Sequence, residues 1–226
     1  MSSIRNALSN PNRRARQLAD FVRYARSINA FVQASFRSSE SWGASGSVQE
    51  PEYPLIRKLC EEASCLPGPI IEIGTLFGFT TTQLALWKGP SKEILTVDNY
   101  RWNPCGLPPD RHYQLTSRVL DFLIQNGHVQ QLHLDKDEFY RTYDGGPPAM
   151  VFLDAVHTYE ETKKDIEWAL HADAAIISGH DYSEEWGGVR KAVDEFGGPA
   201  ELLWSTWVLA RRQPPLEPAA DCAEAR

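Results

Sequence analysis

Short apolar runs alternate with segments of helical periodicity along most of this chain. Because a strand that is buried on both faces has a continuous apolar sequence, these runs predict the strands of a parallel sheet. They occupy residues 70–73, 94–97, 131–134, 150–153 and 174–177. Two later segments, Leu202–Trp204 and Trp207–Leu209, predict an antiparallel pair at the sheet's edge. We therefore expect an α/β fold with a doubly wound, seven-stranded, mostly parallel sheet and an antiparallel edge hairpin.

Amphipathic helices are predicted between the strands and ahead of them. An apolar stripe from Leu18 to Val32 predicts a helix over about residues 12–36. A stretch rich in Ser and Gly, residues 38–48, indicates a connection to a second helix over residues 54–63. The chain is thus expected to have three parts: a basic N-terminal helical arm and linker (residues 1–50), one α/β domain (residues 51–212) and a disordered tail (residues 213–226).

The charge is unevenly distributed. Residues 1–37 carry seven arginines and one acid, Asp20, which gives a charge of +6. Since the net charge of the whole chain is -7, the remaining residues carry -13. Such an arm suits a nucleic acid or an anionic substrate, or alternatively docks on its own domain or on a second subunit. We favour docking, and expect a homodimer or larger homo-oligomer, because the domain shows no basic stripe with interleaved aromatic residues. Nucleic acid is therefore not an expected partner.

The composition is that of an ordinary globular protein, with 42% hydrophobic and 23% charged residues. No apolar run approaches the roughly 20 residues that a membrane-spanning helix needs. The residues after Met1 also lack the apolar core of a signal peptide. We therefore expect a cytoplasmic protein with no membrane partner.

Residues 69–84 form an apolar run, a break at Gly74 and Gly78, and then a helical pattern. A strand, a glycine turn and a helix N-terminus in this order bind anionic or polar ligands, because the ligand can approach the backbone and the unpaired N–H groups. Glu72, at the strand's end, can accept hydrogen bonds from a ligand. The glycine spacing is G-x-x-x-G and not G-x-G-x-x-G, which argues against a dinucleotide such as NAD.

Two further acids follow strands. Asp98 ends the second predicted strand, where a carboxylate can accept hydrogen bonds from both hydroxyls of a ribose. The alternative is a simple strand-end cap. Asp137 follows the third strand and lies either near a bound nucleobase or in a solvated turn.

Acids and histidines also follow the next two strands. Asp154 ends the run at residues 150–153, and His157 stands just before a capping-box start of the next helix. His180 and Asp181 follow the run at residues 174–177. Because the carboxyl ends of parallel strands meet at one edge of a sheet, these four side chains are expected to form a site there.

The segment after Asp98 is too long and too aromatic for a plain connection. Residues 99–111 include Tyr100 and Trp102 and several prolines. We expect a lid over the substrate or cofactor, with both aromatic rings stacking on the acceptor.

Three segments together resemble class I S-adenosylmethionine-dependent methyltransferases, in the small-molecule O-methyltransferase branch of macrocin-, cephalosporin-hydroxylase- and catechol-type-like enzymes. Glu72–Thr80 resembles motif I, roughly E-I-G-x-x-x-G-x-[ST]. Leu153–Glu160, and Gly179–Tyr182 followed by Gly188–Phe196, resemble the later motifs. The resemblance covers about residues 52–210 and implies a Rossmann-like sheet. Three motifs in order are more specific than motif I alone.

The resemblance also implies a cofactor site for S-adenosylmethionine. Glu72, Gly74 and Thr75 would lie around its methionine part, Gly78 and Thr80 would open the adjoining helix, and Asp98 would hold the ribose.

A metal site is implied as well. Asp154 and Asp181 match positions that bind a divalent metal in metal-dependent members, and Mg²⁺ prefers such oxygen ligands. Tyr182 replaces the amide or second acid of the catechol-type pattern. His180 is either a third ligand, which suits a softer metal, or a supporting residue, which we favour.

The expected activity is methyl transfer to a hydroxyl of a small metabolite, assisted by Mg²⁺, with a sugar or glycosylated acceptor favoured. We expect Asp154 and His157 to be catalytic, with His157 as general base because imidazole exchanges protons near neutral pH. Alternatively, His157 only binds the helix start. The alternative functions are phenolic O- or N-methylation, or S-adenosylmethionine binding without catalysis.

Overall fold

The computed structural model describes residues 48–210, so the predicted N-terminal helix and the tail lie outside the described residues. Seven strands form one sheet in the order β3-β2-β1-β4-β5-β7-β6. The strands are β1 (Ile70–Ile73), β2 (Ile94–Asp98), β3 (Val129–His133), β4 (Met150–Leu153), β5 (Ile177–Gly179), β6 (Glu201–Leu203) and β7 (Thr206–Val208). β7 is antiparallel to both of its neighbours, whereas the pairs among β1 to β5 are parallel. The predicted fold class is confirmed.

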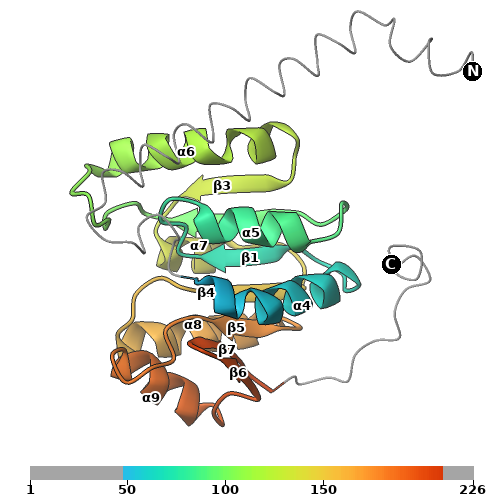
Figure 1. Cartoon of the computed structure of the whole chain (residues 1–226), viewed down its shortest axis with the longest axis vertical. Coiled ribbons are helices and arrows are strands. Elements are labelled where there is room, and N and C mark those ends of the chain that lie inside the picture. Colours follow the sequence, from blue (N-terminus) through green and yellow to red (C-terminus); the bar gives the residue numbers. More distant parts are fainter. Residues whose placement is uncertain (1–47, 211–226) are drawn as a thin grey trace, which may run out of the picture.

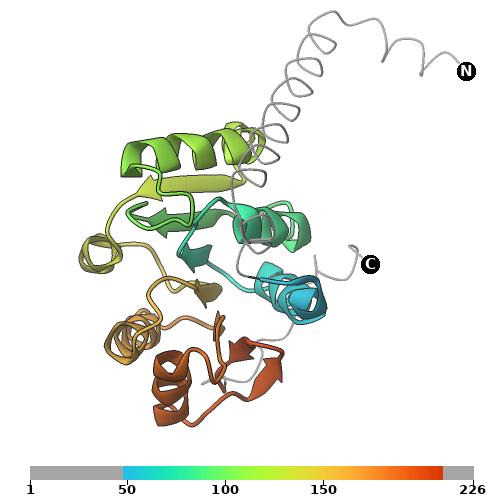
Figure 2. The ribbon, with the colours of Figure 1, turned by 60° about the vertical axis from the view of Figure 1, so that its left-hand side comes forward.

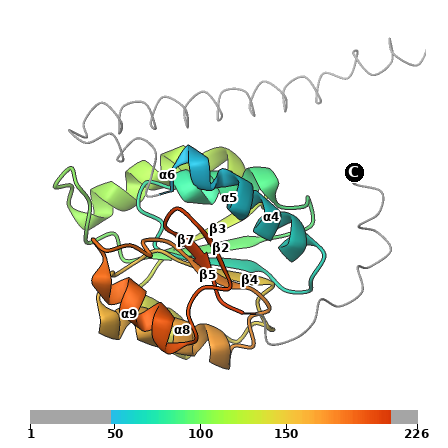
Figure 3. The same cartoon turned by 60° about the horizontal axis from the view of Figure 1, so that its bottom comes forward.

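Helices cover both faces of the sheet (Figures 1 and 3). They are α4 (Tyr53–Ser64), α5 (Phe79–Trp87), α6 (Pro109–Gln125), α7 (Lys136–Thr142), α8 (Tyr159–His171) and α9 (Gly187–Glu195), with a 3-10 turn η1 (Glu50–Glu52) before α4. α4, α5 and α6 pack on one face, and α7, α8 and α9 pack on the other. No helix of residues 48–210 is long and apolar enough to span a membrane.

Alternation along β1 explains where its side chains go. Ile70 packs with the core under α4, α5 and α6, whereas Ile71 and Ile73 pack with the core of α7, α8 and α9. Since successive side chains of a strand point to opposite faces, Glu72 points toward α5 and is fully buried. A strand this deeply buried places an acid inside the protein.

Several elements differ from the sequence expectation, and β6 and β7 each lie one residue earlier than predicted. β3 begins two residues earlier than predicted and ends at His133. β5 begins only at Ile177, because Ala174 belongs to the turn after α8, where its N–H donates to the Ala169 carbonyl at 3.1 Å. α7 was not predicted, and it places Asp137 in a helix and not in a turn.

Figure 2 shows the sheet between its two layers of helices. The carboxyl ends of β1, β2, β4 and β5 lie at one edge of the sheet, because these strands are parallel. In an open parallel sheet, ligands bind at this edge.

Candidate active site

The glycine turn after β1 presses directly on the end of β4. Gly74 has φ +102°, and a Cβ there would lie 2.0 Å from the Asp154 carbonyl oxygen, so no other residue fits without moving the backbone. The Gly74 N–H donates to the Val97 carbonyl at 2.9 Å. Gly78, with φ +80°, stands just before α5, and Thr80 is buried in the helix's first turn. The turn is thereby fixed against both neighbouring strands.

Glu72 is held beneath this turn. Its Oε2 accepts hydrogen bonds from the hydroxyls of Thr81 and Thr96, both at 2.5 Å. Its Oε1 is buried and has no hydrogen-bond partner among the described residues. Burial raises the pKa of Glu72 to about 8, against the lowering effect of the two threonines. A buried carboxyl oxygen without a partner is the kind of group that a cationic ligand satisfies, because the cation favours the ionised form of the carboxyl.

Asp98 holds the glycine turn in this structure. Its Oδ2 accepts hydrogen bonds from the N–H groups of Thr75 and Leu76, both at 2.9 Å, and its Oδ1 accepts one from the Tyr100 N–H at 2.6 Å. Both oxygens lie at the rim next to motif I, as the sequence predicted. Ribose binding by Asp98 stays a prediction.

The prediction that Tyr100 stacks on the acceptor is wrong. Its side chain is fully buried, and its ring packs edge-on against His112 and His133 with centroid distances of 5.1 and 5.3 Å. Its hydroxyl accepts a hydrogen bond from the Gln131 amide at 2.8 Å. Trp102 is 65% exposed, so its ring is accessible to an acceptor.

Asp137 lies in the first turn of α7 and forms ion pairs with Lys136 and Lys164. The hydrogen bond from Lys164 lowers its pKa. These contacts tie α7 to α8. A role for Asp137 beside the cofactor's nucleobase stays a prediction.

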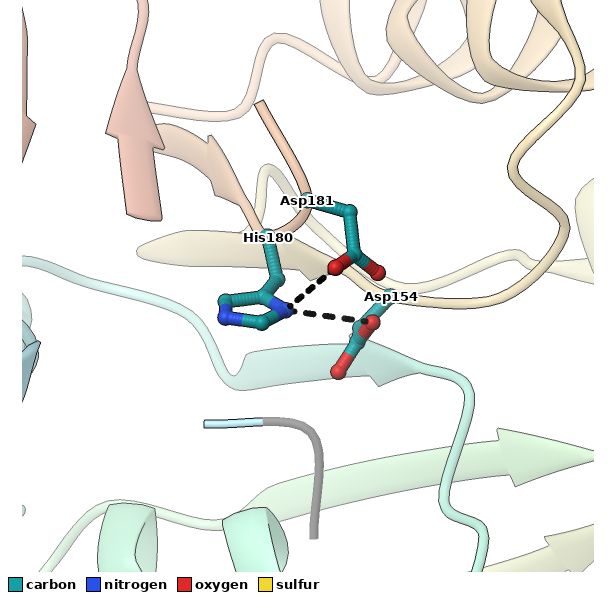
Figure 4. Close-up of side chains that lie close together, drawn as sticks. All are labelled: Asp154, His180 and Asp181. Carbon is teal, nitrogen blue, oxygen red and sulfur yellow. Dashed lines mark ion pairs between the residues drawn. The ribbon is translucent and has the colours of Figure 1, made fainter. Parts of the chain in front are cut away.

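Asp154, His180 and Asp181 converge at the carboxyl ends of β4 and β5 (Figure 4). One ligand atom from each lies within 4.8 Å of the others. His180 Nδ1 is 3.2 Å from Asp181 Oδ1 and 4.0 Å from Asp154 Oδ1. Asp181 has φ +64°, a left-handed conformation that is uncommon outside glycine and often occurs at functional sites. We call these three residues the acidic rim.

His157 contacts both carboxylates of the acidic rim. Its Nε2 is 2.9 Å from Asp181 Oδ2 and 3.5 Å from Asp154 Oδ1, but neither contact has hydrogen-bond geometry. Burial lowers the pKa of His157, whereas the two carboxylates raise it more strongly, to about 9. The Trp186 ring covers the imidazole with a centroid distance of 4.5 Å. The two carboxylates therefore favour the protonated form of the imidazole.

Glu52 is a site residue that sequence reasoning missed. It lies in η1 and is 1% exposed, and both of its carboxylate oxygens are 3.1 Å from His180 Nε2. Burial acts to raise the pKa of Glu52, but the contacts with His180 and the hydrogen bonds from Gln49 and Ser205 together lower the pKa to about 2. An acid before a helix has the pattern of an exposed helix start, so nothing in the sequence marked this one as buried.

Apart from Asp137, the predicted residues thus form two adjoining groups. Glu72, Gly74 and Asp98 build the turn at the ends of β1 and β2, and the acidic rim with His157 follows β4 and β5. The contact of Gly74 with the backbone of Asp154 joins them.

Comparisons with known proteins agree with the fold. Residues 71–182 match a family model described as a methyltransferase domain. The structure of cofactor-bound Rv0187 from MTB is 20% identical, with a TM-score of 0.60, and the match covers 84% of this chain and 88% of that chain. An O-methyltransferase from Bacillus cereus in complex with SAH is 16% identical, with a TM-score of 0.60, and the match covers 85% of this chain and 91% of that chain. CalS11, a TDP-rhamnose 3'-O-methyltransferase, is 16% identical, with a TM-score of 0.52, and the match covers 84% of this chain and 94% of that chain. No curated protein matches the chain by sequence.

The sheet order, the glycine turn after β1 and the polar edge define a class I methyltransferase fold. The match over residues 71–182 confirms the predicted resemblance to a methyltransferase domain. The solved structures, at 20% identity or less, support the fold.

Proposed function

We propose that this protein transfers a methyl group from S-adenosylmethionine to a hydroxyl oxygen of a small metabolite. The observation that carries this proposal is the contact between the two groups of the site, where Gly74 lies against the Asp154 carbonyl. A cofactor held at the glycine turn would lie beside side chains that can bind a cation and accept a proton. Binding alone would require the turn but not the second group.

The turn fits S-adenosylmethionine. The buried Oε1 of Glu72 lacks a donor, and the methionine part of the cofactor carries an ammonium group that could supply one. We propose that the cofactor is held by Glu72, Gly74, Thr75, Gly78, Thr80, Asp98 and Asp137. When bound, it would supply an electrophilic methyl group on a sulfonium.

The acidic rim fits a divalent cation. Asp154 and Asp181 offer carboxylate oxygens and His180 offers a nitrogen, all within 4.8 Å of one another. Two carboxylates suit Mg²⁺, which was the ion expected from the sequence. A cation there would lower the pKa of the acceptor's hydroxyl and fix its orientation.

We propose Asp154 and His157 as the catalytic residues, with His157 accepting the hydroxyl proton. Its side chain is 24% exposed and reaches both carboxylates of the rim. The Trp186 ring restricts its orientation. Because the carboxylates that favour the imidazolium are also the proposed cation ligands, a proton on His157 and a cation at the rim compete for the same negative charge.

Exposed apolar side chains follow the ends of the strands around this site. Trp102, Val156 and Trp186 are 65%, 47% and 38% exposed. Such surfaces suit the face of a sugar or of an aromatic ring. We favour a sugar or glycosylated acceptor, since CalS11, which has a similar fold, is a TDP-rhamnose 3'-O-methyltransferase. A phenolic or amine acceptor is the second candidate.

The test combines binding and transfer. The full chain should be incubated with methyl-labelled S-adenosylmethionine and matched acceptors of three kinds, namely nucleotide sugars, catechols and amines, with and without a divalent cation. We expect cation-stimulated label on a sugar hydroxyl. Label on an amine would replace the proposal with N-methylation, and S-adenosylhomocysteine binding without transfer to any acceptor would indicate a non-catalytic binding protein. Full turnover by Asp154→Ala without cation would refute the metal-assisted mechanism.

A further inference from the structure

The two ring nitrogens of His180 have different environments. Nε2 lies 3.1 Å from each carboxylate oxygen of Glu52 and 2.9 Å from the Ser205 hydroxyl. Nδ1 faces the carboxylates of Asp181 and Asp154 and has no hydrogen-bond partner among the described residues. His180 is only 5% exposed, so this atom is buried.

Glu52 is itself held from several directions. Its Oε2 accepts a hydrogen bond from the Gln49 N–H at 2.8 Å. Its Oε1 accepts from the N–H of Ser205 at 3.1 Å and from the hydroxyls of Ser205 and Thr206, both at 3.0 Å. These donors come from the segment before α4 and from the β6–β7 hairpin. The carboxylate therefore cannot turn away from His180.

The backbone of His180 is fixed too. Its N–H donates to the Leu153 carbonyl at 3.1 Å, and its carbonyl accepts a hydrogen bond from Trp207 Nε1 at 3.0 Å. Because its backbone and Nε2 are both held, the ring has one orientation, in which Nδ1 points at the carboxylates of Asp154 and Asp181 (Figure 4).

Charge then determines which nitrogen carries the hydrogen. A carboxylate in contact with Nε2 requires Nε2–H, so the neutral ring keeps its lone pair on Nδ1. A lone pair facing two carboxylates is repulsive unless a positive centre lies between them. Either a second proton or a metal ion satisfies this requirement.

We propose that Glu52 is a positioning residue that directs the Nδ1 lone pair of His180 toward the carboxylates of Asp154 and Asp181. The acidic rim would then bind a divalent transition ion in preference to Mg²⁺. This inference rests on the proposed function, which already uses the two carboxylates as cation ligands. One imidazole nitrogen with two carboxylate oxygens suits Mn²⁺, Co²⁺ or Zn²⁺, whereas Mg²⁺ is a poor partner for nitrogen. A carboxylate behind a ligating histidine fixes its tautomer and raises its basicity.

The wild-type chain allows a direct test. MnCl₂ should be added to the full chain without cofactor, and the electron spin-echo modulation from a coordinated ¹⁴N nucleus should be recorded. We expect a nitrogen coupling that persists in His157→Ala and disappears in His180→Ala. Manganese bound without nitrogen coupling, or a coupling that only His157→Ala removes, would overturn the proposal.

Calorimetric titration with MnCl₂, ZnCl₂ and MgCl₂ tests the role of Glu52. Glu52→Gln keeps the size of the side chain, but its amide can donate to Nε2 and so favour the tautomer with hydrogen on Nδ1. We expect Glu52→Gln and His180→Ala to weaken Mn²⁺ and Zn²⁺ binding by about 10- to 100-fold, with a change of only a few-fold for Mg²⁺. Equal losses for all three ions, or none, would contradict the positioning role.

The matched control is Asp165→Asn. Asp165 is also a buried carboxylate, 2% exposed, but its partners are Lys136 and Tyr140 and not His180. Its metal affinities should equal those of the wild type. S-adenosylhomocysteine binding, measured separately, distinguishes the two proposals: if the ligand binds and labelled methyl is transferred while the nitrogen coupling is absent, only the inference about Glu52 and His180 fails.

Discussion

At the end of β1, Glu72 keeps one carboxylate oxygen inside the core without a donor, and burial raises its pKa to about 8 from the usual 4.5. Between these two values the unfolded chain releases a proton that the folded chain retains, so this residue makes stability fall as the pH rises from about 4.5 to about 8. Each pKa unit is equivalent to about 1.4 kcal/mol. Glu72→Gln cannot ionise, and its free energy of unfolding should therefore rise relative to the wild type across this range.

Denaturant unfolding at pH 5, 6.5 and 8 would measure this difference, with Glu160→Gln as the control because Glu160 is exposed. If the difference in the free energy of unfolding between Glu72→Gln and the wild type stayed constant over this pH range, Glu72 would ionise normally.

His157 can be separated from cofactor binding. His157→Gln keeps a polar side chain of similar reach but removes the proton acceptor, and we expect kcat to fall about 10²- to 10⁴-fold. The affinity for S-adenosylhomocysteine should change by only a few-fold, because no contact joins His157 to Glu72 or Gly74. Steady-state kinetics and calorimetry measure the two quantities. An unchanged kcat would mean that another group, or none, accepts the proton.

The sequence predicted that Asp154, His157, His180 and Asp181 lie together, because residues that follow buried parallel strands all lie at the carboxyl ends of those strands. It missed Glu52 because this residue meets His180 across 128 positions of the chain and lies in no strand. It misjudged Tyr100 because an aromatic residue in a long loop has the same pattern whether it faces solvent or packs beneath the loop.

Among the elements, the turn after β1 is tightly constrained. Gly74→Ala would place a methyl group 2.0 Å from the Asp154 carbonyl oxygen, at a φ of +102° that L-residues rarely adopt. The backbone conformation alone costs about 1–2 kcal/mol, and the clash adds to it. We expect a loss of more than about 2 kcal/mol in the free energy of unfolding, together with weaker cofactor binding, because the turn must shift away from β4.

Gly146→Ala provides the comparison, since a Cβ there meets nothing within 4 Å. It should change stability by no more than about 0.5 kcal/mol. Similar unfolding curves for the two alanine variants would show that the turn relaxes without cost.

The strands could be predicted where burial on both faces made their sequences wholly apolar, as in β1 and β4. Strand boundaries were harder to predict where apolar residues belong to the end of a helix. Ala174 lies in the turn after α8 and does not extend β5. α7 was missed because its seven residues are too few to show a helical period. Side-chain pattern thus determines a buried strand better than a short surface helix.

At the scale of the whole molecule, the site depends on residues that are far apart in the sequence. The parallel pairing of β1 with β2 and β4 sets Glu72 beside Thr96 and Phe152, and the same register brings Gly74 to Asp154. A ligand across these strand ends would therefore tie together the centre of the sheet. It should stabilise the molecule as a unit.

This coupling predicts the size of a thermal shift. S-adenosylhomocysteine at about 100 times its Kd should add about 2.7 kcal/mol to the free energy of unfolding. In a chain of this length, such a gain raises Tm by about 5–10 °C. NAD, which the glycine spacing argues against, should give no shift. Asp98→Asn tests whether the shift arises at the turn, because this carboxylate holds the N–H groups of Thr75 and Leu76. If the variant folds but shows the full shift, the ligand does not use Asp98, and the ribose assignment fails although the cofactor site stands.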